Sequence, residues 1–302
     1  MFFKKIKYGL KMLFHKYDGR HNNCPSCQNE KYFIINDKAF YKFPTQLRQC
    51  VNCLLFFRHP ITTATESKRY YELEYTQPGL TTDLPNDEQI NALIKANFKD
   101  SEKDFSHWFN LFEKIAQHKN KKLRILDYGA NWGYTVFQLS NLSFVEEVVG
   151  YEYSDIRSKF GKEKLNINYI KESEFSNDFD VVFSSHVIEH MYDPAIIKRH
   201  FDELLNNDGI CIITCPNGSL SRIMSNITGF RQHWGMPHPN LISDKYLQKL
   251  FADYSGVISS DVDPSNLYDI FKSNDSMILS DLPVDGHLLA IMSKAKKNMY
   301  KQ

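Results

Sequence analysis

The sequence predicts an α/β fold in which a parallel sheet carries helices on both faces, with a small cysteine-rich module in front of it. Strand-like and helical patterns alternate from Leu123 onward. Two CxxC pairs lie ahead of that region, and an apolar run ends at Asp127 in the glycine-containing turn "DYGANWG". Such alternation is typical of parallel sheets, because a helix usually forms the crossover between parallel strands.

The composition is that of an ordinary globular protein. The 302 residues are 42% hydrophobic, enough for one large domain and a small one. The 37 basic and 36 acidic side chains nearly cancel, whereas a dedicated nucleic-acid binder usually has a basic surplus. No apolar run approaches the roughly 20 residues of a spanning helix, and no export signal is visible. We therefore expect a cytoplasmic protein, in which the sequons at Asn141, Asn217 and Asn226 carry no glycan.

Residues 1–17 combine apolar and basic side chains at near-helical spacing. The apolar members are Phe2, Phe3, Ile6, Leu10, Leu13, Phe14 and Tyr17. Lysines fill much of the remainder, so the pattern predicts a short basic amphipathic helix. Such a helix can dock on its own protein or make peripheral contact with an anionic membrane surface, here the inner membrane face.

Cys24, Cys27, Cys50 and Cys53 form two CxxC pairs separated by 22 residues. Each CxxC pair can form a tight turn, here called a knuckle, that offers two thiolates. Together the two knuckles offer four thiolates, a set that suits tetrahedral zinc. A module as small as residues 18–60 gains folding energy from the metal. Because sulfur fills all four positions, the zinc is expected to be structural. Disulfides and a redox pair are the alternatives; a reducing cytosol disfavours the first, and the second usually uses one CxxC beside a βαβ unit.

The remaining elements follow in order. Short strands are predicted in "KYFIIN" and "KAFYKF", and residues 61–120 form a helical connector with two helices within residues 86–117. In the main domain, residues 121–302, the predicted strands are "LRILDY", "EVVGYE", "INYI", "FDVVFSSH", "GICIITC", "VISSDVD" and "HLLAIMS". Cys211 and Cys215 belong to a central strand and are expected to be buried as small apolar residues.

The turn after Asp127 fits neither common phosphate-binding motif. Gly129 and Gly133 are four residues apart, whereas the dinucleotide fingerprint is G-x-G-x-x-G, and the chain has no G-x-x-x-x-G-K-[ST]. Asp127, Glu152 and His186 lie at or next to the last residue of a predicted strand. Open α/β sheets bind ligands beyond these carboxyl ends, so we expect the site there.

"LDYGANWG" resembles the first motif of class I S-adenosylmethionine-dependent methyltransferases, a strand followed by D-x-G-x-G-x-G. The chain departs from that motif at Asn131, but asparagine tolerates the left-handed conformation well enough to keep the turn. "VVGYEYS", "FDVVFSSHVIEHMYDP" and "LNNDGICIITCPN" resemble later family motifs in the correct order. The resemblance covers residues 120–295 and implies a Rossmann-like, seven-stranded methyltransferase sheet.

This resemblance also implies how S-adenosylmethionine binds. An acid at the position of Glu152 accepts hydrogen bonds from both ribose hydroxyls in such enzymes. The helix that begins near Gly133 favours the methionine carboxylate. The implied cofactor-binding residues are Asp127, Gly129, Asn131, Gly133, Glu152 and His186.

A four-cysteine module ahead of a methyltransferase resembles a bacterial subgroup that modifies sugars and other small metabolites, in some cases on nucleotide or lipid carriers. By this resemblance Tyr71 and Tyr75 face the cofactor pocket, although packing alone would also explain them. The long segment after the fifth strand contains "RQHWGMPHPN". His233 and Trp234 are expected to contact a sugar there, unless the aromatic residue only pins its own loop.

Methyl transfer to a hydroxyl or a carbon acid requires a base, and histidine titrates in the right range. We favour His190 and His238, while His186 can instead line the cofactor site. Two other functions stay open. Zinc ribbons also precede RNA methyltransferases, although the charge is balanced and no N-P-P-Y-type motif is present. A non-catalytic protein could also retain the fold as a scaffold.

Overall fold

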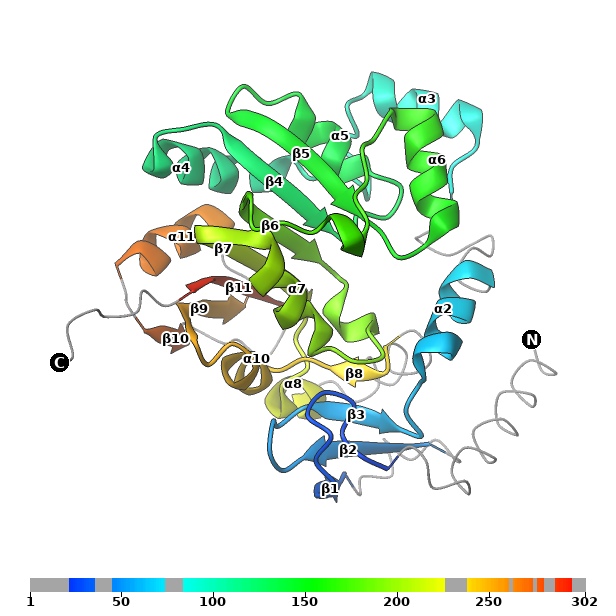
Figure 1. The fold of residues 1–302 in the computed structure, drawn as a ribbon, viewed down its shortest axis with the longest axis vertical. Helices are drawn as coiled ribbons and strands as arrows, with labels where there is room; N and C mark the ends of the chain where they lie inside the picture. The colour runs from blue at the N-terminus through cyan, green and yellow to red at the C-terminus, as the bar shows by residue number, and fades with distance from the viewer. Residues whose placement is uncertain are drawn as a thin grey trace.

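The computed structural model describes residues 22–35, 45–73, 84–225, 238–260, 263–273, 276–279 and 286–294 (Figure 1). Its main sheet has seven strands in the order β10-β9-β11-β7-β6-β4-β5. They are β4 (Leu123–Tyr128), β5 (Val145–Tyr151), β6 (Phe179–Ser185), β7 (Leu205–Pro216), β9 (Tyr254–Ser260), β10 (Met277–Leu279) and β11 (His287–Lys294).

The sheet is mainly parallel. β4 pairs in parallel with β5 and β6, β6 with β7, and β9 with β10. β11 lies antiparallel between β7 and β9. From β4 the chain first continues to β5 on one side and then crosses to β6 on the other, so the strand order reverses at β4. The predicted α/β class with a seven-stranded Rossmann-like sheet is confirmed, and the reversal marks the usual ligand-binding edge.

The predicted strand "INYI" is wrong. This segment forms only an isolated bridge between Gly150 and Tyr169. It follows Asn166, whose left-handed φ of 55° ends the preceding helix, and Glu172 already begins a 3₁₀ helix. Too few residues separate these two turns for a full ladder beside β5. The short strand β10 at the opposite edge completes the seven strands instead.

Helices cover both faces of the sheet. α4 (Phe109–Lys119) and α11 (Pro264–Lys272) lie on one face, and α7 (Ile196–Leu204) and α10 (Asp244–Leu250) lie on the other. Phe112 and Leu267 share one apolar cluster with Phe183, whereas Phe201 and Tyr246 share another with β6 and β7 residues. Burial on both faces explains why the strands read as continuous apolar runs.

A third cluster surrounds Trp132, which is 1% exposed. It joins α3 (Asp87–Lys95), α5 (Tyr134–Ser140) and α6 (Asp155–Leu165). The Trp132 ring centroid lies 5.9 Å from those of both Phe98 and Phe160. The two helices predicted within residues 86–117 are confirmed as α3 and α4. The buried Trp132 side chain thus fixes the turn that follows β4 against these helices.

A small antiparallel sheet lies below the main one in Figure 1. Its strands, in order, are β1 (Tyr32–Ile34), β2 (Gln46–Cys50), β3 (Phe56–His59) and β8 (Asn240–Leu241). "KYFIIN" contains β1 as predicted, while "KAFYKF" lies outside the described residues. β2 was not predicted because "QLRQC" lacks an apolar alternation. The fourth strand, β8, belongs to the predicted main domain, so this sheet joins the front module to that domain.

The other described elements are α2 (Ala64–Leu73), α8 (Leu220–Ser225) and the 3₁₀ helices Ser106–Trp108, Glu172–Glu174 and Ile188–His190. Within the described ranges, every helix is too short or too polar to traverse a lipid bilayer. The amphipathic helix predicted for residues 1–17 lies outside these ranges.

Candidate active site

A cavity of about 900 Å³ lies at the carboxyl ends of β4, β5, β6 and β7. The predicted site residues that line it are Tyr71, Gly129, Asn131, Glu152, His186, His190 and His238. Asp127 and Gly133 are not lining residues. Tyr75, His233 and Trp234 lie outside the described residues. The cavity therefore brings together the strand ends that the sequence pointed to, as expected for an open α/β sheet.

The turn after β4 has the backbone that a glycine motif requires. Gly129 has a φ of 87° and Gly133 a φ of 82°, both in the left-handed region. Asn131 has a φ of 52°, so the asparagine replaces the family's middle glycine without changing the turn. Gly129 also has a close neighbour, because a Cβ there would lie 2.2 Å from Cγ2 of Val187. Only glycine satisfies both restrictions.

Gly129→Ala is expected to lower the free energy of unfolding by about 2–4 kcal/mol, because it adds left-handed strain and an overpacked contact. Denaturant unfolding measures this loss. Adding Val187→Ala removes the contact but leaves the strain, so the double variant should recover only part of the stability. Full recovery would show that the backbone conformation costs nothing and would contradict the assignment.

Glu152 follows β5 directly and closes the turn from the neighbouring strand. The Asn131 N–H donates to its Oε2 and the Ser154 N–H to its Oε1, each at 2.8 Å. Burial raises the pKa of Glu152, whereas these backbone donors and the Arg157 charge act in the opposite direction. A carboxylate has about four acceptor sites, so each oxygen keeps capacity for a further donor. That second donor can come from a ligand in the cavity.

The Asn131 side chain ties the turn to α6. Its Oδ1 accepts from the Trp132 N–H at 2.9 Å and from Nη1 of Arg157 at 2.6 Å. A glycine at position 131 could make neither bond. Arg157 lines the cavity and was missed in the sequence, because a single arginine in a helix carries no positional signal.

Asp127 is 4% exposed and lies within the protein rather than on the cavity wall. Burial and the charge of Glu152 raise its pKa to about 8. The folded protein thus favours the protonated form of Asp127 well above the usual range of an aspartate. The predicted cofactor-binding role of Asp127 stays a prediction, and its position indicates support of the turn.

The free energy of unfolding of Asp127→Asn should increase relative to that of the wild-type protein as the pH rises from about 4 to 8. The unfolded aspartate ionises near 3.8 but the folded one near 8, so its stabilisation is full below 3.8 and is lost as the pH rises through 8. The relative gain is at most about 1.4 kcal/mol per pH unit. Urea unfolding at pH 5 and pH 8 measures it, with the exposed Asp155→Asn as the control. An equal difference at both pH values would contradict the burial effect.

Four titratable side chains gather beyond the carboxyl end of β6. They are those of His186, Glu189, His190 and His238. Nδ1 of His186 lies 3.3 Å from Oε1 of Glu189, and Nε2 of His190 lies 3.8 Å from the same oxygen. The ring centroids of His190 and His238 are 4.6 Å apart. Burial alone would raise the pKa of Glu189, but the three histidines outweigh it and lower the pKa to about 2. Burial likewise opposes protonation of His186, yet Glu189 raises its pKa.

The structure therefore brings together the two predicted bases, His190 and His238, which are 48 positions apart in the sequence. It also adds Glu189, which lies within the stretch "FDVVFSSHVIEHMYDP" but was not predicted as a site residue. The signal was present, because a carboxylate between two candidate bases is a common way to orient an imidazole.

A family profile described as "Methyltransferase domain" matches residues 101–255, more than half of the chain. The chain belongs to this methyltransferase family. The matched region contains β4 to β7, the turn, Glu152 and the histidine cluster. The predicted enzyme class, an S-adenosylmethionine-dependent methyltransferase, is confirmed, whereas the methyl acceptor stays a prediction. No curated protein matches the sequence.

Several solved structures are similar to this methyltransferase at low identity. The plantazolicin methyltransferase BpumL in complex with SAH is 15% identical over 76% of this chain and 94% of its own, with a TM-score of 0.48. The plantazolicin methyltransferase BamL with a triazolic desmethylPZN analog and SAH is 14% identical over 70% and 92%, with a TM-score of 0.49. A putative type 11 methyltransferase from Sulfolobus solfataricus is 19% identical over 64% and 92%, with a TM-score of 0.42.

The cavity of the methyltransferase has a second group of polar aromatic residues that the sequence analysis missed. The Tyr128 hydroxyl lies 2.8 Å from Nδ1 of His200, and the Tyr151 hydroxyl donates to Oε1 of Glu172 at 2.6 Å. Burial raises the pKa of both phenols and lowers that of His200, so these groups stay neutral. Tyr128 follows Asp127 and Tyr151 precedes Glu152. Strand alternation therefore could have placed them on the opposite face of the same edge.

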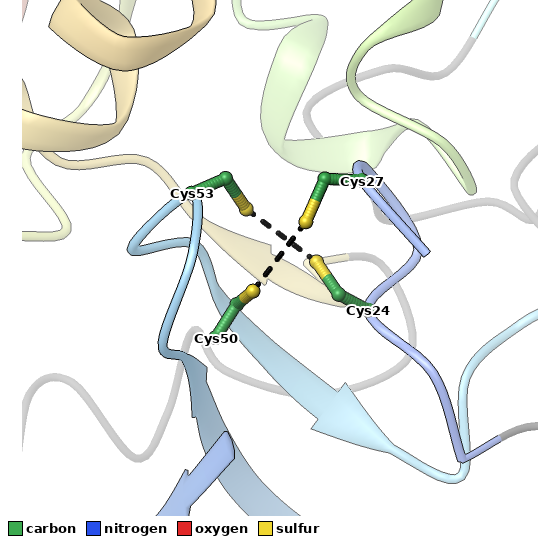
Figure 2. A group of neighbouring side chains, drawn as sticks. All are labelled: Cys24, Cys27, Cys50 and Cys53. Atoms are coloured by element: carbon green, nitrogen blue, oxygen red, sulfur yellow. Dashed lines mark hydrogen bonds between the residues drawn. The ribbon is translucent and has the colours of Figure 1, made fainter. Parts of the chain in front are cut away.

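The four cysteines predicted to bind zinc point toward one another (Figure 2). The Sγ atoms of Cys24 and Cys53 are 3.5 Å apart, as are those of Cys27 and Cys50, and all four lie within 4.8 Å of one another. Zinc–sulfur bonds of about 2.3 Å in a tetrahedron separate the sulfurs by about 3.8 Å. The thiols are free rather than disulfide-bonded, so the donor set fits the metal. Cys211 and Cys215 are buried, as predicted.

The small sheet continues from the cysteine cluster toward the histidine cluster of the methyltransferase. β3 pairs with β8, and the Arg58 N–H donates to the Pro239 carbonyl at 2.8 Å. Nδ2 of Asn240 donates to the Met191 carbonyl at 2.6 Å. His238 is thus followed at once by residues bonded to β3 on one side and to the segment after His190 on the other.

Proposed function

We propose that this methyltransferase binds S-adenosylmethionine across the ends of β4 and β5 and methylates a small molecule, a sugar or a carrier-linked glycan intermediate. The observation that carries the proposal is the Glu152 carboxylate on the cavity wall. Both of its oxygens are held by backbone N–H groups, and both can still accept. Two adjacent ribose hydroxyls are donors that match this pair.

The chain contributes mainly orientation and the exclusion of water. When bound, S-adenosylmethionine supplies a methyl group on a positively charged sulfur. Gly129 allows close approach of a ligand, because its backbone carries no side chain. Phe105 and Trp108 also line the cavity and offer apolar surface that displaces water.

The acceptor is assigned to the end of the cavity with His190 and His238. Tyr71 lies edge-on to His190, with the ring centroids 6.1 Å apart. An aromatic surface beside hydrogen-bonding groups suits a sugar, whose rings have apolar faces and polar edges. We assign activation of the acceptor hydroxyl to the two histidines, consistent with their position on the cavity wall.

We further propose that Cys24, Cys27, Cys50 and Cys53 hold a structural zinc ion. Four sulfurs leave no coordination position for water or substrate, so this metal takes no part in the chemistry. Its role is to hold the two knuckles together, since the small sheet buries too little apolar surface for independent stability.

Calorimetry with S-adenosylhomocysteine tests the cofactor site, and saturable binding of one molecule per chain is expected. Labelled S-adenosylmethionine with a cell extract then tests the transfer. We expect label in a low-molecular-weight or carrier-linked product. Absence of cofactor binding would overturn the proposal and favour a non-catalytic scaffold. Label confined to RNA would overturn the small-molecule assignment.

A further inference from the structure

Glu189 is a buried carboxylate that faces three histidines. The residue is 2% exposed, and neither Oε1 nor Oε2 has a well-formed hydrogen bond among the described residues. Nδ1 of His186 and Nε2 of His190 lie 3.3 and 3.8 Å from Oε1. An ionised buried carboxylate is costly unless it is hydrogen-bonded, paired or bound to a metal.

The donors around Glu189 have the arrangement of a metal site. One carboxylate oxygen of Glu189 and one ring nitrogen each of His190 and His238 all lie within 4.8 Å of one another. Metal–ligand bonds of about 2.1 Å place neighbouring donors about 3.0–3.8 Å apart, and opposite donors about 4.2 Å apart. The 3.8 Å between Oε1 and Nε2 of His190 falls in this range.

The three donors also come from two separate segments that the fold holds together. Glu189 and His190 belong to the 3₁₀ helix after β6, whereas His238 precedes β8. The bond from Asn240 to the Met191 carbonyl fixes one segment against the other. His190 and His238 line the cavity and Glu189 is buried, so an ion among them would face the acceptor.

We propose that Glu189, His190 and His238 bind a divalent transition-metal ion at the acceptor end of the cavity, with His186 positioning the Glu189 carboxylate. Two imidazoles and one carboxylate favour iron, manganese, cobalt, nickel or zinc over magnesium or calcium. This site is separate from the cysteine cluster and has a different donor chemistry. A histidine that orients a ligating carboxylate is a usual second partner of such sites.

The role of the ion in methyl transfer rests on the proposed function. Three protein ligands leave open positions on the ion, which suit an acceptor with two neighbouring oxygen atoms, such as a vicinal diol or a hydroxy-carbonyl compound. A hydroxyl bound to the ion loses its proton more readily. His190 and His238 would then hold the ion rather than take the proton themselves, and the proton of the acceptor hydroxyl would pass to solvent water as the methyl group moves from the sulfonium sulfur to the acceptor oxygen.

Titration with Co²⁺, followed by absorption, tests the site in protein that carries one equivalent of zinc, which the four thiolates bind first because thiolates select zinc. We expect one Co²⁺ per chain with weak ligand-field bands and no strong thiolate charge-transfer band. His238→Ala and Glu189→Gln should each weaken the binding by at least about tenfold, and His186→Ala by about tenfold. His107→Ala is the matched control, because His107 lines the same cavity outside this cluster and should leave the bands unchanged.

Absence of Co²⁺ binding at millimolar concentrations, or equal affinity in His238→Ala, would overturn the metal site. Thiolate bands alone would also overturn it, since they report the cysteine cluster. S-adenosylhomocysteine calorimetry on the same samples keeps the two proposals apart. Cofactor binding without Co²⁺ binding leaves only the methyltransferase proposal, and Co²⁺ binding without cofactor binding leaves only the metal site.

Discussion

Glu152→Ala is expected to weaken S-adenosylhomocysteine binding by at least about a hundredfold. Each hydrogen bond between a ribose hydroxyl and the carboxylate contributes about 1.5–3 kcal/mol, and every 1.4 kcal/mol is a factor of ten in affinity. The variant also removes the acceptor for the Asn131 and Ser154 N–H groups, so the turn itself loses its support. Calorimetry gives the affinity, and thermal unfolding shows whether the fold is retained.

Glu147→Ala is the matched control, because Glu147 lies on β5, the strand that Glu152 follows, but pairs with Arg124 at the surface. Its affinity for S-adenosylhomocysteine should equal that of the wild-type protein. Glu152→Gln keeps one acceptor oxygen and is expected to give an intermediate loss. If Glu152→Ala folds and binds with unchanged affinity, the ribose assignment fails.

The part of the site that the sequence predicts best is the edge of the sheet. Asp127, Glu152 and His186 lie at or next to the last residue of a predicted strand, and carboxyl ends of parallel strands meet at one edge. Local pattern alone therefore placed them near one another. Asn131 was also read correctly, because its left-handed tolerance is a property of one residue and its own backbone.

Other features depend on contacts that no local pattern contains. His238 meets His190 only because β8 pairs with β3, and a two-residue strand carries no periodicity. The "INYI" segment has the alternation of a strand, but the turns on either side leave room for one bridge to Gly150. Tertiary contacts determine whether such short segments form strands, whereas a long apolar strand can be predicted from its own sequence.

The small sheet links the cysteine cluster to the cavity wall that contains His238. Ser26, within the first knuckle, lies beside the Tyr246 hydroxyl at 2.9 Å, and β3 holds β8 next to His238. The cysteine cluster is therefore a support for a wall of the cavity. The proposed zinc, although it has no open coordination position, would then act by fixing one wall of the cavity.

Cys50→Ser is expected to release the zinc, unfold the small sheet and abolish most of the methyl transfer. Cys50 is 0% exposed and ends β2, so the loss of its bond reaches β3 and then β8. Zinc contributes about 10 kcal/mol or more in small zinc domains, which exceeds what such a sheet can gain by burial. Metal analysis, limited proteolysis of residues 22–59 and transfer of labelled methyl groups measure the three effects.

Cys215→Ala supplies the comparison, because Cys215 is equally buried but lies on β7 outside the cluster. It should keep the zinc of the cysteine cluster and a protease-resistant small sheet. The physical claim is that the metal, rather than apolar burial, holds β3 and β8 in place beside His238. A Cys50→Ser protein that is zinc-free, protease-resistant and fully active would therefore show that the sheet stands without its metal.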